Sequence, residues 1–455
     1  MGRERRQKFR LGEVGLFTAP FRGALSSSTY KAPHKLGDTP ALDRRGAGDG
    51  AGLCAGTYYS APVPKLWEKP LASEVIELLK QLIRFDTVSP EGKQYEDLVK
   101  FLKGWLEERG VSARIEYVDP EYKAKACPKG GPRPILFAWV GEGEPILEFN
   151  GHYDVVPPGE GWEDAFEPKL EGEYLIGRGA SDMKSGIAAV AAALANISDW
   201  KGPKVQAVFV PDEEVGGECG TGYRVSHLKD KYPIGKHVLI AEPGGVYIGH
   251  KGMIWIKVKV KGKQAHASRP WEGENAFLKA SALALKIGEE LFQRFLKRPS
   301  SYEYESQHPF SKFNVFNMGG IARSNTSAFN IIPEEFTFSL DVRVIPEERA
   351  ENVAREVLEI IGDEAEKELV EMMEPFINPN STLAKIIIEK GWAEREVVSE
   401  GGLDLRFYRG YDAVSWGPGI TSEAHKIGEK VNVKRVEEFV KYYSQLPKEL
   451  VARGG

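Results

Sequence analysis

The feature that most constrains this chain is a set of five loops in which a histidine or an acidic residue follows an apolar run or starts a helix. Four of the runs have the length of a strand: PILEF, KVQAVFV, HVLIA and DAVSWGPG. The fifth block, GRGASDMKSG, places an acidic residue at the start of an alanine-rich helical stretch. In chain order, the loops carry His152 and Asp154, Asp182, the run Asp212, Glu213 and Glu214, Glu242, and His425.

These side chains are expected to meet, because ligands of open α/β sheets bind beyond the carboxyl ends of the parallel strands. Each residue alone has an ordinary interpretation. Asp182 could cap its helix, the acidic run could be a solvated turn, and a histidine after a strand is often a surface residue. Five such loops at one sheet edge are harder to explain in this way, because clustered carboxylates repel one another unless a cation offsets the charge.

Imidazoles and carboxylates together suit zinc, cobalt or manganese. The chain offers more of them than one catalytic ion with an open position can use. The set suits two ions about 3.5–4 Å apart that share a bridging carboxylate. Of the adjacent Glu213 and Glu214, one would then be a ligand, and the other would act as a general base toward a water molecule.

The order of helical and strand-like patterns predicts an α/β fold with an insertion. Strand-length apolar runs alternate with helical stretches, which favours an open, mostly parallel sheet flanked by helices over residues 69–250 and 374–455. Residues 251–373 read as β-α-β-β-α-β, a split-βαβ or ferredoxin-like unit, which we call the inserted domain. Residues 1–68 lack periodicity and are expected to be a disordered extension.

Composition excludes several classes of partner. The net charge of −5 gives no reason to expect nucleic acid or an anionic membrane, and no apolar run approaches the length of about 18 residues that a membrane span needs. The three cysteines are far apart, odd in number and not spaced like metal ligands. They favour a reduced, cytoplasmic protein.

The blocks GHYDVVP, GRGASDMKSG, PDEEVGG, AEP and EAHKIGE resemble, in order and in spacing, those of the dinuclear-zinc deacylase and carboxypeptidase family. That family includes acetylornithine deacetylase, succinyl-diaminopimelate desuccinylase, aminoacylase and glutamate carboxypeptidase. The resemblance implies two divalent metal ions, zinc first, with cobalt and manganese as alternatives. It assigns His152 and Glu242 to one ion, Glu214 and His425 to the other, and Asp182 as the bridge.

The same resemblance assigns roles around the metal ions. Glu213 would be the general base, and the Asp154 carboxylate would bind the far nitrogen of His152. A cis peptide is expected after the bridging acid, between Asp182 and Met183.

Further roles fall on the inserted domain and on a glycine pair. His266 would stabilise the oxyanion across a homodimer. Asn330 and Arg343 would hold the substrate, and Arg343 suits a carboxylate through its bidentate geometry. Gly401 and Gly402 would receive a substrate carboxylate through their backbone amides, although the next residue is a leucine where relatives often have threonine.

The hypothesis is therefore an amidohydrolase that cleaves an N-acyl amino acid by means of a metal-activated water. A dipeptidase or carboxypeptidase with the same site is the alternative within the class. An inactive metal-binding protein is the alternative outside it, and the presence of both Glu213 and Glu214 argues against that reading.

Overall fold

The structure is a computed structural model that describes residues 70–454. The extension expected over residues 1–68, which includes Cys54, lies outside the described residues. In the part of the chain that is described, no helix is long and apolar enough to cross a membrane.

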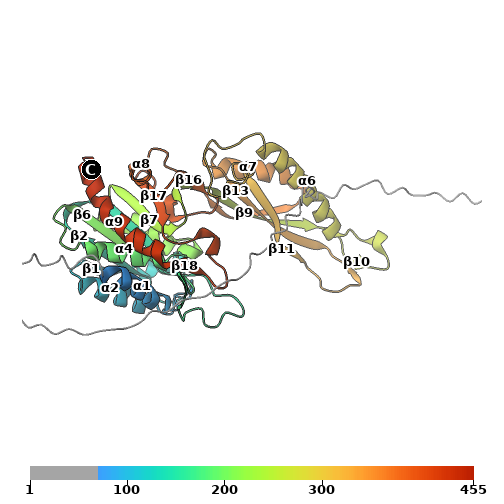
Figure 1. Cartoon of the computed structure of the whole chain (residues 1–455). Coiled ribbons are helices and arrows are strands. Elements are labelled where there is room, and N and C mark those ends of the chain that lie inside the picture. Colours follow the sequence, from blue (N-terminus) through green and yellow to red (C-terminus); the bar gives the residue numbers. More distant parts are fainter. Residues whose placement is uncertain (1–69, 455) are drawn as a thin grey trace, which may run out of the picture. The chain divides into compact units, whose positions relative to one another are not determined.

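A nine-stranded sheet forms the centre of the larger domain (Figure 1). In spatial order its strands are β1 (Ser112–Tyr117), β2 (Pro134–Val140), β6 (Pro203–Val210), β3 (Glu142–His152), β7 (His237–Pro243), β17 (Asp412–Gly417), β8 (Val246–His250) and β15 (Phe376–Ile377), with β16 (Glu396–Ser399) paired to β8. The four strands β6, β3, β7 and β17 are parallel neighbours, whereas β1 and β2 at one edge and β8 and β15 at the other pair antiparallel. The predicted α/β sheet is confirmed, with antiparallel strands added at both edges.

Side chains that alternate along the strands cover both faces of this sheet, because successive residues of a strand point to opposite sides. Leu136 and Ala138 of β2 belong to the main core, which includes residues of five helices. Ile135 and Phe137 of the same strand belong to a second core beside α5 (Tyr223–His227). The helices of the main core are α1 (Pro70–Ile83), α2 (Tyr95–Glu107), α4 (Lys184–Asn196), the short α8 (Thr382–Glu389) and α9 (Val433–Ala452).

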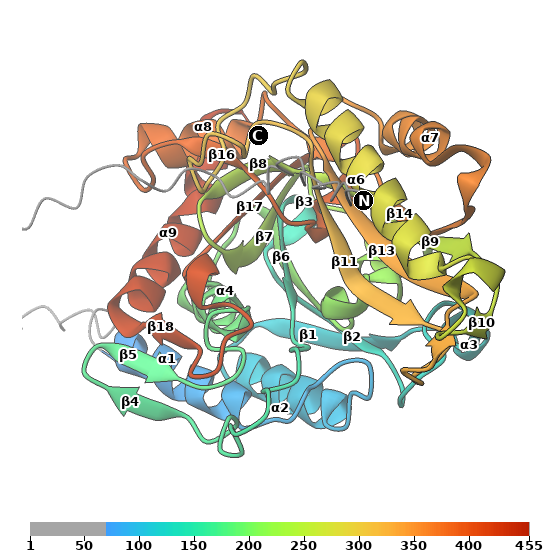
Figure 2. The ribbon, with the colours of Figure 1, turned by 90° about the vertical axis from the view of Figure 1, so that its right-hand side faces the viewer.

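The inserted domain folds as its pattern predicts. Its elements are β9 (Gly252–Lys261), α6 (Ala276–Phe295), β11 (Val315–Ser324), β13 (Glu335–Val344), α7 (Ala350–Ile361) and β14 (Glu366–Met373). The strands form an antiparallel sheet in the order β11-β13-β9-β14, and α6 and α7 pack on one face of it (Figure 2). Alternate residues of β9, such as Ile254 and Ile256, are buried against these helices, so Trp255 and Lys257 point to the other face. The domain limits predicted from the sequence stay a prediction.

The remaining elements are short and connect or extend the two domains. They are α3 (Pro120–Ala126), the sheet of β4 (Lys169–Glu171), β5 (Tyr174–Ile176) and β18 (Lys430–Asn432), and the pair β10 (Ala265–His266) with β12 (Ile331–Ile332). The sequence patterns did not predict β8 and β16. Runs of four or five residues such as VYIGH and EVVS are too short to reveal a period.

Candidate metal centre

The strand order explains why the acidic and imidazole side chains meet. His152 is the last residue of β3, Glu242 lies near the end of β7, and Glu213 and Glu214 follow β6 in a short 3₁₀ turn. His425 follows β17, and Asp182 precedes α4. Because β6, β3, β7 and β17 are adjacent and parallel, their carboxyl ends lie side by side at one edge of the sheet.

Asp182 lies between the two imidazoles. One of its oxygens, Oδ1, is 3.2 Å from Nε2 of His152, and the other, Oδ2, is 3.5 Å from Nε2 of His425. On the first side, Nε2 of His152 is also 3.4 Å from Oε1 of Glu242. On the second side, Nε2 of His425 is 3.0 Å from Oε2 of Glu214. The structure thus brings together all five residues predicted as metal ligands, in two groups that share Asp182.

The electrostatics of this cluster fit a pair of divalent cations. Burial raises the pKa of Glu242 to about 8, and the neighbouring Asp182 adds to this rise while His152 opposes it. Burial, followed by the charge of Asp182, raises the pKa of Glu214 to about 7. Within residues 70–454, no lysine or arginine forms an ion pair with these carboxylates, whose only such partners are the two histidines. Carboxylates so poorly compensated, beside two imidazoles, are a donor set that suits zinc, cobalt or manganese.

His152 is held by both the backbone carbonyl and the carboxylate of Asp154. Its Nδ1 lies 3.0 Å from the backbone carbonyl oxygen of Asp154, whereas the nearest carboxylate oxygen of Asp154 is 3.4 Å away. The Asp154 carboxylate thus contacts the nitrogen that the resemblance assigned to it, and the backbone carbonyl of the same residue is a second, closer acceptor. A hydrogen bond to this carbonyl makes Nδ1 the protonated nitrogen and leaves Nε2 free to bind a cation.

The Asp154 carboxylate has a second role, in the turn that follows β6. Its two oxygens accept hydrogen bonds from the backbone amides of Glu213 and Glu214, each 3.1 Å long. The preceding Asp212 has a left-handed backbone, with φ of 63°, and its carboxylate binds Arg133 and the hydroxyl of Tyr95. Two buried acids thus hold the turn that carries the predicted base and its neighbouring ligand.

We expect Asp154→Asn to weaken metal binding about 10- to 100-fold, the usual cost of losing a group that orients a ligand. Asparagine has one acceptor oxygen and no charge, so it cannot accept from both amides at once. Competition with a chromophoric zinc chelator measures the affinity. Asp164→Asn is the matched control, because Asp164 lies in the same loop, is half-exposed and, among residues 70–454, forms an ion pair only with Lys169. Equal affinities in the two variants would contradict this role of Asp154.

Sequence reasoning missed Asp404, which lies in the first turn after the glycine pair. It is 1% exposed, and neither of its carboxylate oxygens has a hydrogen-bond partner in the described part of the chain. Burial, followed by the charges of Asp404 and Glu242, raises the pKa of Glu213 well above its ordinary value. The only signal in the sequence was an acidic residue in GGLDLR, which is not distinctive by itself.

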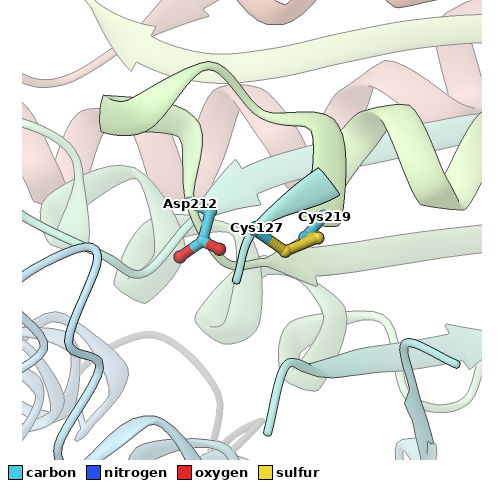
Figure 3. Close-up of side chains that lie close together, drawn as sticks. All are labelled: Cys127, Asp212 and Cys219. Carbon is cyan, nitrogen blue, oxygen red and sulfur yellow. A yellow bond between two sulfur atoms is a disulfide. The ribbon is translucent and has the colours of Figure 1, made fainter. Parts of the chain in front are cut away.

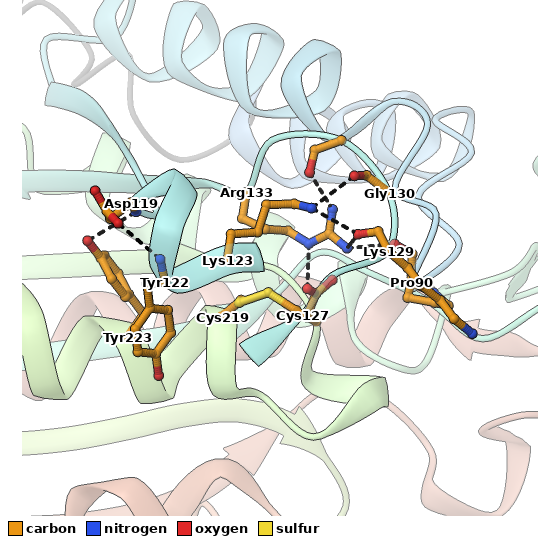
Figure 4. Close-up of a disulfide and its surroundings, with 12 residues drawn as sticks. Pro90, Asp119, Tyr122, Lys123, Cys127, Lys129, Gly130, Arg133, Cys219 and Tyr223 are labelled. Carbon is orange, nitrogen blue, oxygen red and sulfur yellow. Dashed lines mark hydrogen bonds and ion pairs between the residues drawn. A yellow bond between two sulfur atoms is a disulfide. The ribbon is translucent and has the colours of Figure 1, made fainter. Parts of the chain in front are cut away.

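The expectation of reduced cysteines is wrong for two of the three. Cys127 and Cys219 form a disulfide across 92 residues of sequence, with their Cα atoms 6.4 Å apart (Figures 3 and 4). Distance along the chain could not reveal this, because the sheet brings the end of α3 beside the segment that follows β6. Figure 3 also places Asp212 next to the disulfide, but the three groups are not a second metal site. The sulfur atoms are bonded to each other, and the Asp212 carboxylate is bound to Arg133 and Tyr95.

The predicted substrate-binding residues divide into two places. A cavity of about 370 Å³ opens on the metal centre, and Arg343 and Gly402 line it together with Glu213 and Glu214. The amide of Gly401 is already engaged, because it donates to Oγ of Ser399 at 3.1 Å.

His266 and Asn330 lie away from this cavity, at the paired strands β10 and β12. In Figure 2, β10 lies beside the end of β11. Both are exposed, the carbonyl of Asn330 accepts a hydrogen bond from the amide of Ala267, and neither residue lines the cavity.

The non-proline cis peptide that was expected between Asp182 and Met183 is confirmed.

Comparison with known proteins gives a consistent result. Residues 149–449 match the peptidase family M20/M25/M40. A curated relative, the succinyl-diaminopimelate desuccinylase of Nautilia profundicola, is 30% identical over 331 residues, which cover 69% of this chain and 80% of the relative.

Solved structures resemble the fold. Human carnosine dipeptidase 1 superposes with a TM-score of 0.63 at 16% identity, over 84% of this chain and 98% of that one. The YXEP protein of Bacillus subtilis, a dinuclear metal-binding peptidase of the M20 family, superposes with a TM-score of 0.54 at 16% identity, over 83% of this chain and 98% of that one.

Proposed function

The chain belongs to the peptidase family M20/M25/M40, and from this premise we propose that it removes the acyl group from an N-acyl amino acid. Members of this family are metal-dependent hydrolases of amide and peptide bonds. The substrates would be of the acetylornithine or succinyl-diaminopimelate type, and the enzyme would serve amino-acid biosynthesis. The observation that carries the proposal is Asp182 between His152 and His425, with Glu213 beside them. The name of the desuccinylase relative supports the choice of substrate.

Two zinc ions held by His152, Glu242, Asp182, Glu214 and His425 would supply Lewis acidity and lower the pKa of a water molecule toward neutrality. Glu213 would accept the proton of the attacking water and deliver it to the leaving amine. Its carboxylate receives no hydrogen bond from the described residues, so its oxygens are available for this proton. The turn that Asp154 holds would keep Glu213 aimed at the site.

Arg343 would bind a carboxylate of the substrate. Asp341 already holds its guanidinium, with Nε 2.9 Å from Oδ1 and one terminal nitrogen 3.1 Å from Oδ2. This ion pair fixes the arginine in the wall of the cavity, and its other terminal nitrogen has no hydrogen-bond partner among residues 70–454, so it could bind a ligand. Gly402, which lines the same cavity, would contribute a backbone amide.

We further propose a homodimer in which His266 and Asn330 of the partner subunit complete the site. The support is their exposure on the inserted domain, away from the cavity of their own chain. Helix α6 also exposes large apolar side chains, with Leu278 63% and Leu285 76% accessible, as expected of a surface that another subunit covers. Light scattering that gives the mass of one 50.5 kDa chain would exclude this arrangement.

Localisation is a separate proposal. The sequence predicts the cytoplasm, whereas a disulfide such as Cys127–Cys219 is more usual in oxidising compartments. Fractionation of the source cells would decide between these two locations.

The function is tested on metal-loaded protein, prepared with and without residues 1–68. The panel contains N-acetylornithine, N-succinyl-diaminopimelate and a set of dipeptides, and metal content is measured by mass spectrometry. We expect about two metal ions per chain and hydrolysis of the acyl amino acids, which a chelator abolishes and added zinc restores. Faster cleavage of dipeptides would make the protein a dipeptidase instead. Two bound ions without hydrolysis of any substrate would indicate an inactive metal-binding protein.

A further inference from the structure

The open face of the inserted sheet carries an acidic residue beside an exposed aromatic ring. In the register of the sheet, Trp255 of β9 lies directly opposite Asp341 of β13 on one side and Glu371 of β14 on the other. Directly opposed residues of antiparallel strands point to the same face, with their Cβ atoms about 5 Å apart. This is the face away from α6 and α7, because the neighbouring Ile254 and Val342 are buried against those helices.

The same face forms one wall of the cavity on the metal centre. Trp255, Glu371 and Arg343 line that cavity together with Glu213, Glu214 and His425. Glu371 also lines an adjoining cavity of about 340 Å³, which continues away from the metal centre past Arg406. A substrate whose amide lies at the metal centre therefore has Glu371 within reach of its distal end.

In the described part of the chain, the other charged side chains on this face of the inserted sheet have partners. Arg343 is paired with Asp341. Arg406, across the cavity, lies 3.5 Å from the Asp404 carboxylate and donates to the carbonyl oxygens of Leu403 and Gly216. The lysines of β9 that share this face pair with other acids, Lys257 with Glu368 and Lys259 with Glu335. Among residues 70–454, no side chain or amide forms a hydrogen bond or ion pair with the Glu371 carboxylate.

An unpaired carboxylate next to an aromatic ring is a site for a cation. The carboxylate attracts the charge directly, and the face of an indole ring attracts cations through its quadrupole. Trp255 is 38% exposed, so a ligand can contact its ring. An anionic group placed here would be repelled by the Glu371 carboxylate. A purely apolar group would remove water from that carboxylate without giving it a partner.

We propose that Glu371 and Trp255 determine the specificity of this enzyme by binding a distal ammonium group on the amino-acid part of the substrate. The inference rests on the proposed deacylase function and adds to it the residues that select a diamino acid over a neutral or acidic one. Arg343 would bind the carboxylate of the same amino acid, so the wall would recognise both charges of a zwitterionic ligand.

The test uses three substrates that differ in the charge at the end of the side chain: Nα-acetyl-L-ornithine, Nα-acetyl-L-norvaline and Nα-acetyl-L-glutamate. The metal-loaded wild type is expected to prefer acetylornithine. Glu371→Gln should lower kcat/KM for acetylornithine about tenfold and change that for acetylnorvaline by less than about twofold, the size expected for one charged and aromatic contact. Glu371→Lys should shift the preference toward acetylglutamate.

Glu368→Gln is the matched control, because Glu368 lies on the same strand, carries the same charge and does not line either cavity. This variant should behave as the wild type. Binding of the products L-ornithine and L-norvaline, measured by calorimetry in wild type and Glu371→Gln, gives a readout that does not depend on turnover. Only L-ornithine should bind more weakly to the variant.

The test distinguishes a failure of this inference from a failure of the proposed function. If the wild type hydrolyses acyl amino acids and Glu371→Gln changes all three substrates equally or none of them, this inference is overturned and the proposed function stands. If the wild type hydrolyses none of the three and does not hydrolyse N-succinyl-diaminopimelate either, the proposed function falls and the inference falls with it.

Discussion

Glu213→Gln should reduce kcat by about 10³-fold or more while the protein still binds two metal ions. The substitution preserves the size of the side chain and removes its ability to accept a proton. General acid–base catalysis contributes about 10²- to 10⁴-fold, and here the same group would act on both the water and the leaving amine. The site around Glu213 favours this role, because burial and the neighbouring Asp404 and Glu242 raise its pKa well above the usual value.

The adjacent Glu214→Gln provides the contrast. Oε2 of Glu214 is 3.0 Å from Nε2 of His425, which places it in the second ligand group, so its loss should release metal. Steady-state kinetics and metal content measured by mass spectrometry separate the two variants. A Glu213→Gln protein that turns over at a near-normal rate would remove this residue from the role of base. A Glu213→Gln protein that has lost its metal would make it a ligand, as its place beside His152 and Glu242 also permits.

Reduction of the Cys127–Cys219 disulfide should lower the free energy of unfolding by about 3–4 kcal/mol, with a fall of several degrees in Tm. The bond closes a loop with a sequence separation of 92 residues, which includes β2, β3, α4 and β6. A cross-link that closes so long a loop strongly reduces the conformational entropy of the unfolded chain. Cys219 also lies in the segment that follows Glu214, beside the second core, so the bond holds the segment that carries the predicted base.

Calorimetry of the same protein with and without a reducing agent measures this effect without any substitution. The double variant Cys127→Ala with Cys219→Ala should melt as the reduced wild type does, and should be insensitive to the reductant. Equal stability in the oxidised and reduced protein would show that the bond does not stabilise this fold.

The positions of the candidate metal ligands could be predicted from local sequence. His152 and Glu242 each follow a recognisable apolar strand, and Asp182 precedes a recognisable helix. Once the strands are taken as parallel, their carboxyl ends must meet, whatever the details of packing. The alternating pattern of β9 likewise predicted a sheet with one covered face.

The partners of several side chains could not be predicted in the same way. The Asp154 carboxylate was expected to bind His152, two residues away, and it also accepts hydrogen bonds from two backbone amides about 60 residues away. Cys127 and Cys219 meet across 92 residues, and Glu371 lies on the wall of a cavity that opens on residues from the other domain. Each of these depends on how elements far apart in the chain pack against one another.

The sequence by itself therefore determined the elements, their order and the loops that carry the acids and imidazoles, because hydrophobic periodicity and turn residues act over a few neighbouring positions. Only the tertiary structure decided which carboxylate contacts which amide, which cysteines are bonded and which charge is left without a partner. Those outcomes depend on distances of a few ångströms between segments that the chain itself places tens to hundreds of residues apart.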